Sequence, residues 1–294
     1  MHHFEDTPKL DDQAISERVQ DILSAKHEGI LLPGAYGSML GMVDLTTLEG
    51  SDNTEKVRQL CKKAVSFAAQ GEGIPNVAAV CVYPTLVATA RKELDGTGIH
   101  VASVAGAFPS GLSPLKIRVE ETRYAVGEGA DEIDMVISRG RLLEGDYHYV
   151  YDEVAAIREA CGNVRLKVIL EAGELKTATL IRRASEIAIA AGADFIKTST
   201  GKVQPAATLE AMLVMLEAVN HHHNRTGKMI GIKPAGGISD AETALKFYTL
   251  THHVLGDKWL TKDYFRFGAS RLADALVNAA KGLKPGEKPT EGGY

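Results

Sequence analysis

The chain is poor in cysteine. Its 294 residues include three cysteines, Cys61, Cys81 and Cys161, and these form neither a Cys-x-x-Cys motif nor a paired Cys/His pattern. An odd number of widely spaced cysteines argues against a disulfide scaffold and against a structural zinc site. The pattern favours a protein of the reducing cytosol.

Long apolar runs and basic blocks are also missing. No uninterrupted apolar run reaches the roughly 18 residues that a membrane span requires, and the first residues, MHHFEDTPKL, are polar and acidic. The chain carries 33 basic and 38 acidic residues, a net charge of −5, without a long basic block. These features argue against nucleic acid or a membrane as a partner, so we expect a soluble, cytoplasmic protein.

Common ligand-binding motifs are absent too. No Gly-x-Gly-x-x-Gly follows an early candidate strand, as a dinucleotide-binding fold requires. A P-loop ending at Lys202 is excluded, because it would need glycine at Ile196 and Ser or Thr at Val203. Neither His-x-His nor His-Glu-x-x-His occurs on a candidate strand end. The sequence therefore predicts no metal and no cofactor.

Short apolar runs alternate with longer segments of helical periodicity, and this alternation predicts the fold. Helices between near-continuous apolar strands indicate a parallel sheet covered by its crossovers. Eight such units in roughly 250 residues match a (β/α)8 TIM barrel, of the α/β class, better than an open doubly wound sheet. The candidate strands are residues 39–45, 76–83, 100–108, 132–138, 165–171, 195–200, 229–235 and 264–269.

We expect a single domain with an extension at each end. The barrel is predicted for residues 38–282, after a leader of residues 1–37 that contains an amphipathic helical stretch. Residues 283–294 form a tail whose composition predicts flexibility.

A short internal echo relates the fourth and sixth candidate strands. The segments GADEIDMV and GADFIKTS each leave a helix with Gly-Ala-Asp and then enter a strand, and the fifth residue after each glycine is Asp134 or Lys197. Alternate strands of such a barrel supply side chains to the same interior layer. We therefore expect Asp134 and Lys197 to face each other inside the barrel.

Three lysines lie inside successive strands, at Lys167, Lys197 and Lys233. A single strand lysine is usually at an edge, with its ammonium in water. In a closed barrel, outward lysines would lie beneath the covering helices, so an inward direction toward the C-terminal mouth costs less free energy.

Ammonium groups that share a partly dry pocket destabilise one another. Burial and like charge lower the pKa of a lysine from about 10.4 toward roughly 7–8, where a neutral amine is available. A neutral amine attacks carbonyl groups and forms a Schiff base, which supports carbon-carbon cleavage without a metal. Asp134 or Asp44 would then transfer protons.

Glycine-rich turns follow the sixth, seventh and eighth strands, in TSTGK, PAGGIS and FGAS. Such turns expose backbone N–H groups, and barrels commonly bind phosphate after strands seven and eight. Lys202 and the hydroxyls of Ser239 and Ser270 would add to this site. One cluster alone would indicate only a tight turn, but three in succession favour a phosphate site.

These motifs resemble those of the deoxyribose-phosphate aldolase family, class I aldolases with a TIM-barrel fold, from about residue 40 to residue 294. The matching segments are VDLTTL, VCVYP, GADEIDMV, LKVILEAGEL, AGADFIKTSTGK, IKPAGGI and YFRFGAS. The resemblance implies reversible cleavage of 2-deoxy-D-ribose 5-phosphate into acetaldehyde and D-glyceraldehyde 3-phosphate.

By matching position, the resemblance implies that Lys197 forms the Schiff base, that Lys233 perturbs it and that Asp134 completes the proton relay. Asp44 and Lys167 would line the pocket. Further substrate contacts are implied for Thr46, Thr198, Gly201, Lys202, Gly236, Gly237, Ser239, Gly268 and Ser270.

The resemblance also implies a catalytic role for the last residue, Tyr294, which would enter the site and assist proton transfer. About 12 residues at ~3.4 Å each span ~40 Å, enough to climb past the barrel wall. Family members often carry Arg where Ser239 stands and Ser where Arg271 stands, so the basic group is moved to the neighbouring loop. Ala172 replaces an expected Thr.

Two alternatives stay open. The chain could be another Schiff-base aldolase with a different sugar phosphate, or a non-catalytic barrel that binds sugar phosphates. The presence of Lys197, Lys233 and Asp134 together argues against the second. A sugar phosphate and an aldehyde are the expected small-molecule partners, and a homodimer is allowed.

Overall fold

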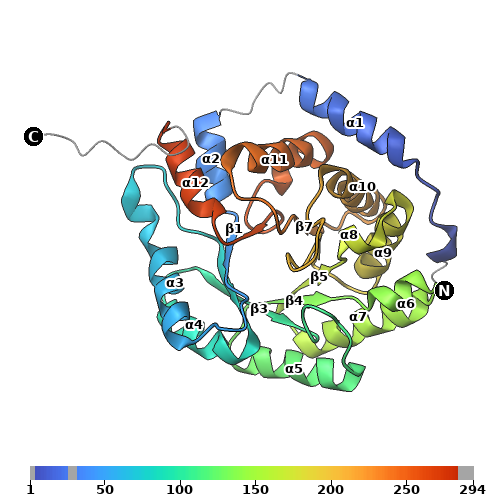
Figure 1. The fold of residues 1–294 in the computed structure, drawn as a ribbon, viewed down its shortest axis with the longest axis horizontal. Helices are drawn as coiled ribbons and strands as arrows, with labels where there is room; N and C mark the ends of the chain where they lie inside the picture. Colours follow the sequence, from blue (N-terminus) through green and yellow to red (C-terminus); the bar gives the residue numbers. More distant parts are fainter. Residues whose placement is uncertain (1–3, 26–31, 284–294) are drawn as a thin grey trace, which may run out of the picture.

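Eight parallel strands close into a barrel. The computed structural model describes residues 4–25 and 32–283. The strand order is β7-β6-β5-β4-β3-β2-β1-β8, and bridges from Ile232 to Phe265 and from Ala235 to Gly268 connect the two ends of the sheet. Helices surround the strands on all sides in the view along the barrel axis (Figure 1). The predicted (β/α)8 barrel is confirmed.

All eight candidate strands are present, but the hydrogen-bonded segments are shorter than the apolar runs. The first run illustrates the difference, because residues 39–40 end a helix and the strand begins only at Val43. The strands are β1 Val43–Thr46, β2 Ala79–Val82, β3 His100–Ala105, β4 Glu132–Val136, β5 Arg165–Ile169, β6 Phe195–Lys197, β7 Gly231–Lys233 and β8 Phe267–Ala269.

The helices follow the strands around the barrel, and several begin at a side-chain cap. Asn53, Thr177, Thr208 and Asp240 each accept a hydrogen bond from a backbone N–H in the first turn of the helix that follows. The helices are α1 Asp12–Ser24, α2 Leu32–Leu40, α3 Thr54–Ser66, α4 Val87–Glu93, α5 Leu115–Gly127, α6 Arg139–Leu143, α7 Tyr147–Cys161, α8 Ala172–Leu175, α9 Ala178–Ala190, α10 Leu209–Thr226, α11 Ala241–Leu255 and α12 Leu272–Ala280.

The Gly-Ala-Asp echo corresponds to a repeated structural turn. Asp131 accepts hydrogen bonds from the backbone N–H of Val101 and from Arg91, both at 2.8 Å. Asp194 binds the backbone N–H of Leu166 and an arginine of α7 in the same way. Each turn thus ties the start of one strand to its neighbour, which fixes the register that places Asp134 and Lys197.

Additional segments pack outside the barrel. Helix α1 lies against α10 and α11, and α2 lies against α12 (Figure 1). Ile15, Val19 and Ile22 form the buried face of α1, as the amphipathic pattern predicts. No helix within residues 4–25 and 32–283 is long and apolar enough to cross a membrane. The division into leader, barrel and tail stays a prediction, and residues 284–294 lie outside the described residues.

Candidate active site

Three strands bring the predicted catalytic trio together inside the barrel. Lys197 and Lys233 are register partners on β6 and β7, and Asp134 lies on β4 with its side chain pointing into the same interior. All three are buried; Lys197 is 3% exposed and the other two are fully enclosed. Asp134 and Lys197 therefore face each other, as the sequence echo predicted.

One carboxylate oxygen binds both lysines. Oδ2 of Asp134 lies 2.7 Å from Nζ of Lys197 and 2.8 Å from Nζ of Lys233. The other oxygen, Oδ1, accepts a hydrogen bond from Nζ of Lys167 at 2.9 Å. Nζ of Lys233 also lies 2.5 Å from Oδ2 of Asp44. Asp134 is thus the centre of a buried ionic cluster, because it contacts all three strand lysines.

A second set of charges adjoins this cluster, and sequence reasoning missed two of its members, Arg266 and Glu132. Arg266, which is fully buried, contacts Oδ1 of Asp44 at 2.6 Å and Oε1 of Glu132 at 2.7 Å. Lys167 forms an ion pair with Glu132 as well. Arg266 was visible in the segment YFRFGAS, where it directly precedes β8.

The amine of Lys197 is held with a lowered pKa. Burial lowers the pKa of Lys197 below its usual value, and the positive charge of Lys233 acts in the same direction against the opposing effect of Asp134. The wall beside it is apolar, because Leu48, Cys81 and Val104 belong to one buried cluster inside the barrel mouth. Lys197 is therefore the lysine of this cluster that is prepared to lose its proton.

The other lysines keep their protons. Burial alone would lower the pKa of Lys233, but Asp134 and Asp44 outweigh it and raise that pKa above its usual value. The pKa of Lys167 is raised as well, because Asp134 and Glu132 outweigh the effect of burial. Burial would raise the pKa of Asp134, yet the three lysines hold it well below its usual range. The cluster thus has one amine of low basicity beside stable ammonium groups.

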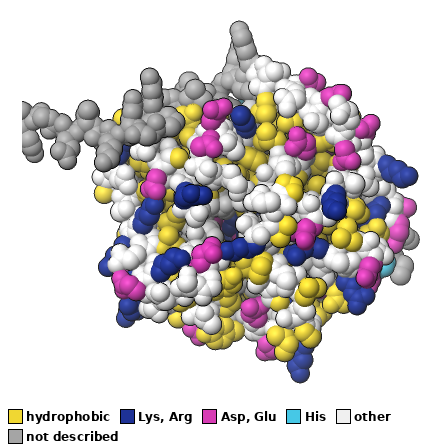
Figure 2. All heavy atoms as spheres, viewed as in Figure 1, with side chains coloured by type: hydrophobic (Ala, Val, Ile, Leu, Met, Phe, Trp, Pro, Cys, Tyr) yellow, Lys and Arg dark blue, Asp and Glu magenta, His cyan; other side chains and the backbone are white. Residues whose placement is uncertain are grey.

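Lys197 lies at the inner end of a cavity of about 760 Å³ that opens among the loops after β1, β6, β7 and β8. The face seen along the barrel axis is hollowed near its centre, with basic and acidic side chains around the hollow (Figure 2). Residues predicted for the site that line the cavity are Thr46, Lys197, Gly201, Lys202, Gly236, Gly237, Ser239, Gly268 and Ser270.

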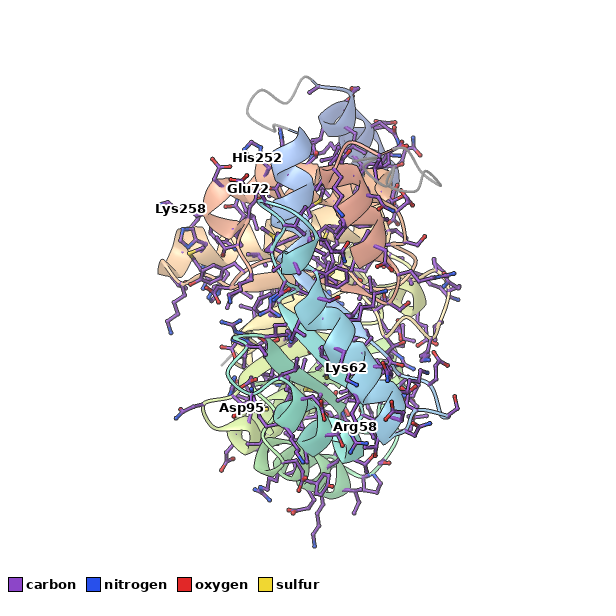
Figure 3. All side chains as sticks on the ribbon, turned by 90° about the vertical axis from the view of Figure 1, so that its left-hand side faces the viewer. Arg58, Lys62, Glu72, Asp95, His252 and Lys258 are labelled. Carbon is purple, nitrogen blue, oxygen red and sulfur yellow. The ribbon has the colours of Figure 1, made fainter. Side chains whose placement is uncertain are left out.

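Helix α3 supplies a wall that the sequence analysis did not assign. Lys56, Gln59 and Lys63 recur at helical spacing and line the cavity. Arg58 and Lys62 lie on another face of the same helix and point to solvent (Figure 3). The sequence carries these residues as a polar stripe at i, i+3 and i+7, a pattern that the sequence analysis did not consider.

Glycines are required where the loops after β6, β7 and β8 meet. A Cβ on Gly236 would lie 2.7 Å from Cβ of Ala206 and 2.9 Å from Cα of Gly201. A Cβ on Gly268 would lie 3.0 Å from Cε of Lys233, so this glycine makes room for the second lysine. The glycines thus shape the cavity in addition to exposing backbone.

The far side of the cavity is suited to an anion. The backbone N–H groups of Gly237, Ser239 and Ser270 donate to no acceptor within the described residues. Lys202 and Arg271 line the same region, and Nζ of Lys202 lies 2.9 Å from Oε1 of Glu49. Free N–H groups beside cations favour a phosphate.

Three predicted substrate residues do not reach the cavity. Thr198 is buried, and its Oγ1 accepts a hydrogen bond from the backbone N–H of Ala235, so it joins β6 to the segment after β7. Asp44 and Lys167 lie beneath the cavity within the ionic cluster. Tyr294 lies outside the described residues.

A closed β/α barrel with a poorly basic lysine at the inner end of its mouth defines an enzyme equipped for amine chemistry on carbonyl compounds. Residues 38–255 match the DeoC/LacD family aldolase, and the chain belongs to this family. It is therefore a class I aldolase, a carbon-carbon lyase.

Named relatives agree with the family assignment. The chain is 43% identical over 273 residues to a putative deoxyribose-phosphate aldolase of Caenorhabditis elegans, which covers 92% of this chain and 87% of the relative. It is 47% identical over 241 residues to the deoxyribose-phosphate aldolase of Homo sapiens, covering 78% and 76%. The crystal structure of a putative deoxyribose-phosphate aldolase from Coccidioides immitis superimposes with a TM-score of 0.70 at 27% identity, covering 92% and 98%.

Proposed function

We propose that the protein reversibly cleaves 2-deoxy-D-ribose 5-phosphate into D-glyceraldehyde 3-phosphate and acetaldehyde through a Schiff base on Lys197. The observation that carries the proposal is the difference between two adjacent lysines, because burial and the charge of Lys233 lower the pKa of Lys197 while Lys233 keeps its proton. The names of the relatives support the choice of substrate.

The chemistry begins with attack of the neutral amine of Lys197 on the C1 aldehyde of the open-chain sugar. Loss of water gives an iminium, which withdraws electrons from C2. Removal of the proton from the C3 hydroxyl breaks the C2–C3 bond, releases D-glyceraldehyde 3-phosphate and leaves an enamine on Lys197. Protonation at C2 and hydrolysis then release acetaldehyde and restore the amine.

Asp134 and Lys233 divide the proton handling between them. Asp134 stays ionised in the resting site and contacts both lysines, so it is placed to accept a proton and to return it through water. Lys233 stays protonated and supplies the positive charge that keeps the neighbouring amine available. Asp44 holds Lys233 in place from below.

The phosphate of the substrate would occupy the far side of the cavity. This placement is supported by the cationic side chains of Lys202 and Arg271 and by the N–H groups of Gly237, Ser239 and Ser270, which have no acceptor in the described part of the chain. A phosphate bound there would leave the aldehyde end of the sugar near Lys197, because Lys197 and the proposed phosphate-binding residues line the same cavity.

Trapping of the Schiff base tests the proposal. Sodium borohydride added with acetaldehyde reduces the imine to a stable secondary amine. We expect mass spectrometry to find the modification on the peptide that contains Lys197, and K197M to remain unmodified. Labelling of Lys233, or no labelling, would show that the nucleophile is assigned wrongly.

Turnover on several sugar phosphates, with and without a chelator, distinguishes the remaining aldolase and binding-only alternatives. Highest turnover on 2-deoxy-D-ribose 5-phosphate, unaffected by the chelator, is the expected result. The catalytic role of Tyr294, the homodimer and the cytoplasmic location stay predictions. Removing Tyr294 alone tests the first of these.

A further inference from the structure

Glu171, directly after β5, has a backbone conformation that is unusual for its side chain. Its φ is 54° and its ψ is 57°, the left-handed region that residues other than glycine seldom adopt. The residue is fully buried. Strain of this kind persists only where the surroundings enforce it, and it concentrates at functional sites.

The carboxylate of Glu171 binds one residue of the loop after β6 at two points, and its Oε2 also lies 3.8 Å from Nη1 of Arg139. Oε1 accepts a hydrogen bond from the backbone N–H of Thr200 at 3.1 Å, and Oε2 accepts one from its hydroxyl at 2.5 Å. The same hydroxyl oxygen accepts a hydrogen bond from the backbone N–H of Lys202 at 3.1 Å. A continuous chain of bonds therefore runs from Glu171 to Lys202.

Backbone contacts fix the two loops to each other on either side of this chain of bonds. The N–H of Ala172 donates to the carbonyl oxygen of Thr198 at 2.9 Å. A Cβ on Gly173 would lie 2.0 Å from the carbonyl oxygen of Pro205, so the loops touch where only glycine fits. The segment after β5 thus contacts the turn at both of its ends, Thr198 and Pro205, and supports its conformation.

We propose that Glu171 is a positioning residue for the phosphate site. It does not line the cavity, whereas Thr200, Gly201 and Lys202 do. By holding Thr200 at two points, Glu171 fixes the left-handed turn at Gly201, whose N–H has no acceptor among the described residues, and holds the Lys202 segment at the proposed phosphate site. This inference rests on the proposed function and adds a residue that determines affinity for the phosphorylated substrate.

The test compares Glu171→Gln with a matched control, Glu174→Gln. Glutamine has one acceptor oxygen and cannot accept both bonds from Thr200 as a carboxylate does. Glu174 lies on the same short helix and pairs with Arg139, which is also 3.8 Å from Glu171. This control therefore separates the pairing with Arg139 from the bonds to Thr200. Thr200→Val and Thr200→Ser form a second pair, because only serine keeps the hydroxyl that joins Glu171 to Lys202.

The readouts are kcat and KM on 2-deoxy-D-ribose 5-phosphate and on unphosphorylated 2-deoxy-D-ribose, and the dissociation constant of inorganic phosphate. E171Q and T200V should each raise the KM for the phosphorylated sugar and weaken phosphate binding by roughly tenfold, the effect of one charged hydrogen bond. Values of kcat/KM on the unphosphorylated sugar should change by less than about threefold. T200S should recover most of the affinity, and E174Q should retain it.

An equal loss on both sugars in E171Q and T200V would overturn the proposal, because it would mean that Glu171 supports Lys197 or the fold in general. Unchanged phosphate binding in these variants, or no phosphate binding by the unsubstituted protein, would overturn it as well. Failure of the unsubstituted protein to cleave the phosphorylated sugar would refute the proposed function instead, while the binding measurement with inorganic phosphate still judges Glu171.

Discussion

Lys197 and Lys233 are paired residues on neighbouring strands, and their ammonium nitrogens contact the same oxygen of Asp134, at 2.7 and 2.8 Å. Lys233 has a second carboxylate, Asp44, at 2.5 Å, whereas Lys197 is turned toward the cavity. Lys233 contacts two carboxylates and therefore stays protonated, whereas Lys197 contacts one and is the lysine that can lose its proton.

Replacing Lys233 by leucine should reduce turnover strongly and the free energy of unfolding only moderately. Without this cation the pKa of Lys197 rises, because burial alone then opposes the effect of Asp134. We expect turnover at neutral pH to fall by roughly 100-fold or more, with the pH profile shifted to higher pH. Asp44 keeps Arg266 at 2.6 Å, so less stability is lost than the about 3–5 kcal/mol of an unpaired buried charge. Unchanged turnover at pH 7 would contradict this account.

Replacing Lys197 by methionine should abolish activity and stabilise the fold. A lowered lysine pKa means that the folded state disfavours the ammonium form, so below that pKa this group opposes folding. Asp134 retains Lys167 and Lys233 in the variant. We expect a Tm higher by about 2–4 °C near neutral pH, which corresponds to roughly 1 kcal/mol. Thermal unfolding by calorimetry measures it, and a lower Tm would contradict the cause assigned.

The fold and the clustering of Lys197, Lys233 and Asp134 inside the barrel could be predicted because both follow from patterns within single segments. Near-continuous apolar runs between helices indicate parallel strands. A lysine inside such a run points into the barrel, because an outward side chain would be buried beneath the helices. The echo added a relation between Asp134 and Lys197 that the structure confirms at 2.7 Å. Local sequence patterns were sufficient here, because in a symmetric barrel the position of a residue along its strand determines its place in the interior.

Three features could not be predicted in the same way. They are the opposite pKa shifts of Lys197 and Lys233, the buried position of Arg266, and the part of the cavity wall that α3 forms. The sequence analysis predicted a lowered pKa for every strand lysine. It could not distinguish them, because the number of carboxylates around each lysine depends on contacts between strands far apart in the chain. Lys233 lies 2.5 Å from Asp44, which is remote in sequence. Lys56 and Lys63 line the cavity because of where α3 packs, which its own sequence does not show.

The buried carboxylates predict how stability depends on pH. Asp134 and Glu132 have pKa values well below their usual range, since nearby lysines and Arg266 outweigh the effect of burial. The unfolded chain therefore binds more protons near pH 4, and the free energy of unfolding should fall as pH decreases below about 5, with full stability above it. Urea denaturation between pH 3 and 7 measures this slope. A flat profile would contradict it.

A control for this slope is Glu120→Gln, which removes a carboxylate whose pairing with Arg123 is exposed to solvent. Surface pairs contribute little to stability, so the pH profile of this variant should match that of the unsubstituted protein.

Arg266 should be a principal determinant of stability. Methionine at this position would remove the guanidinium that joins Asp44 to Glu132, while Lys233 stays beside Asp44 and Lys167 beside Glu132. We expect the free energy of unfolding to fall by roughly 1.5–3 kcal/mol, the contribution of a charged buried hydrogen bond, because a lysine remains beside each carboxylate. Arg165→Met is the matched control, because Arg165 pairs with the same glutamate at 3.3 Å from a partly exposed position. Equal losses in the two variants, measured by urea denaturation, would contradict the distinction.

Arg271 should contribute to phosphate affinity without contributing to stability. It lines the cavity, is exposed, and forms no ion pair with any described residue. Arg271→Ser should raise the KM for 2-deoxy-D-ribose 5-phosphate by roughly three- to tenfold, leave kcat unchanged and shift the free energy of unfolding by less than about 0.5 kcal/mol.

The control for Arg271 is Arg58→Ser, an arginine of α3 that points away from the cavity (Figure 3) and should leave KM unchanged. Ser239 lies in the neighbouring loop and also lines the cavity, so the double variant S239R/R271S returns a basic group to the same region. Recovery of KM in the double variant would show that the guanidinium has only moved between loops. An equal KM in R271S and the unsubstituted protein would instead leave the phosphate to Lys202 and the backbone N–H groups.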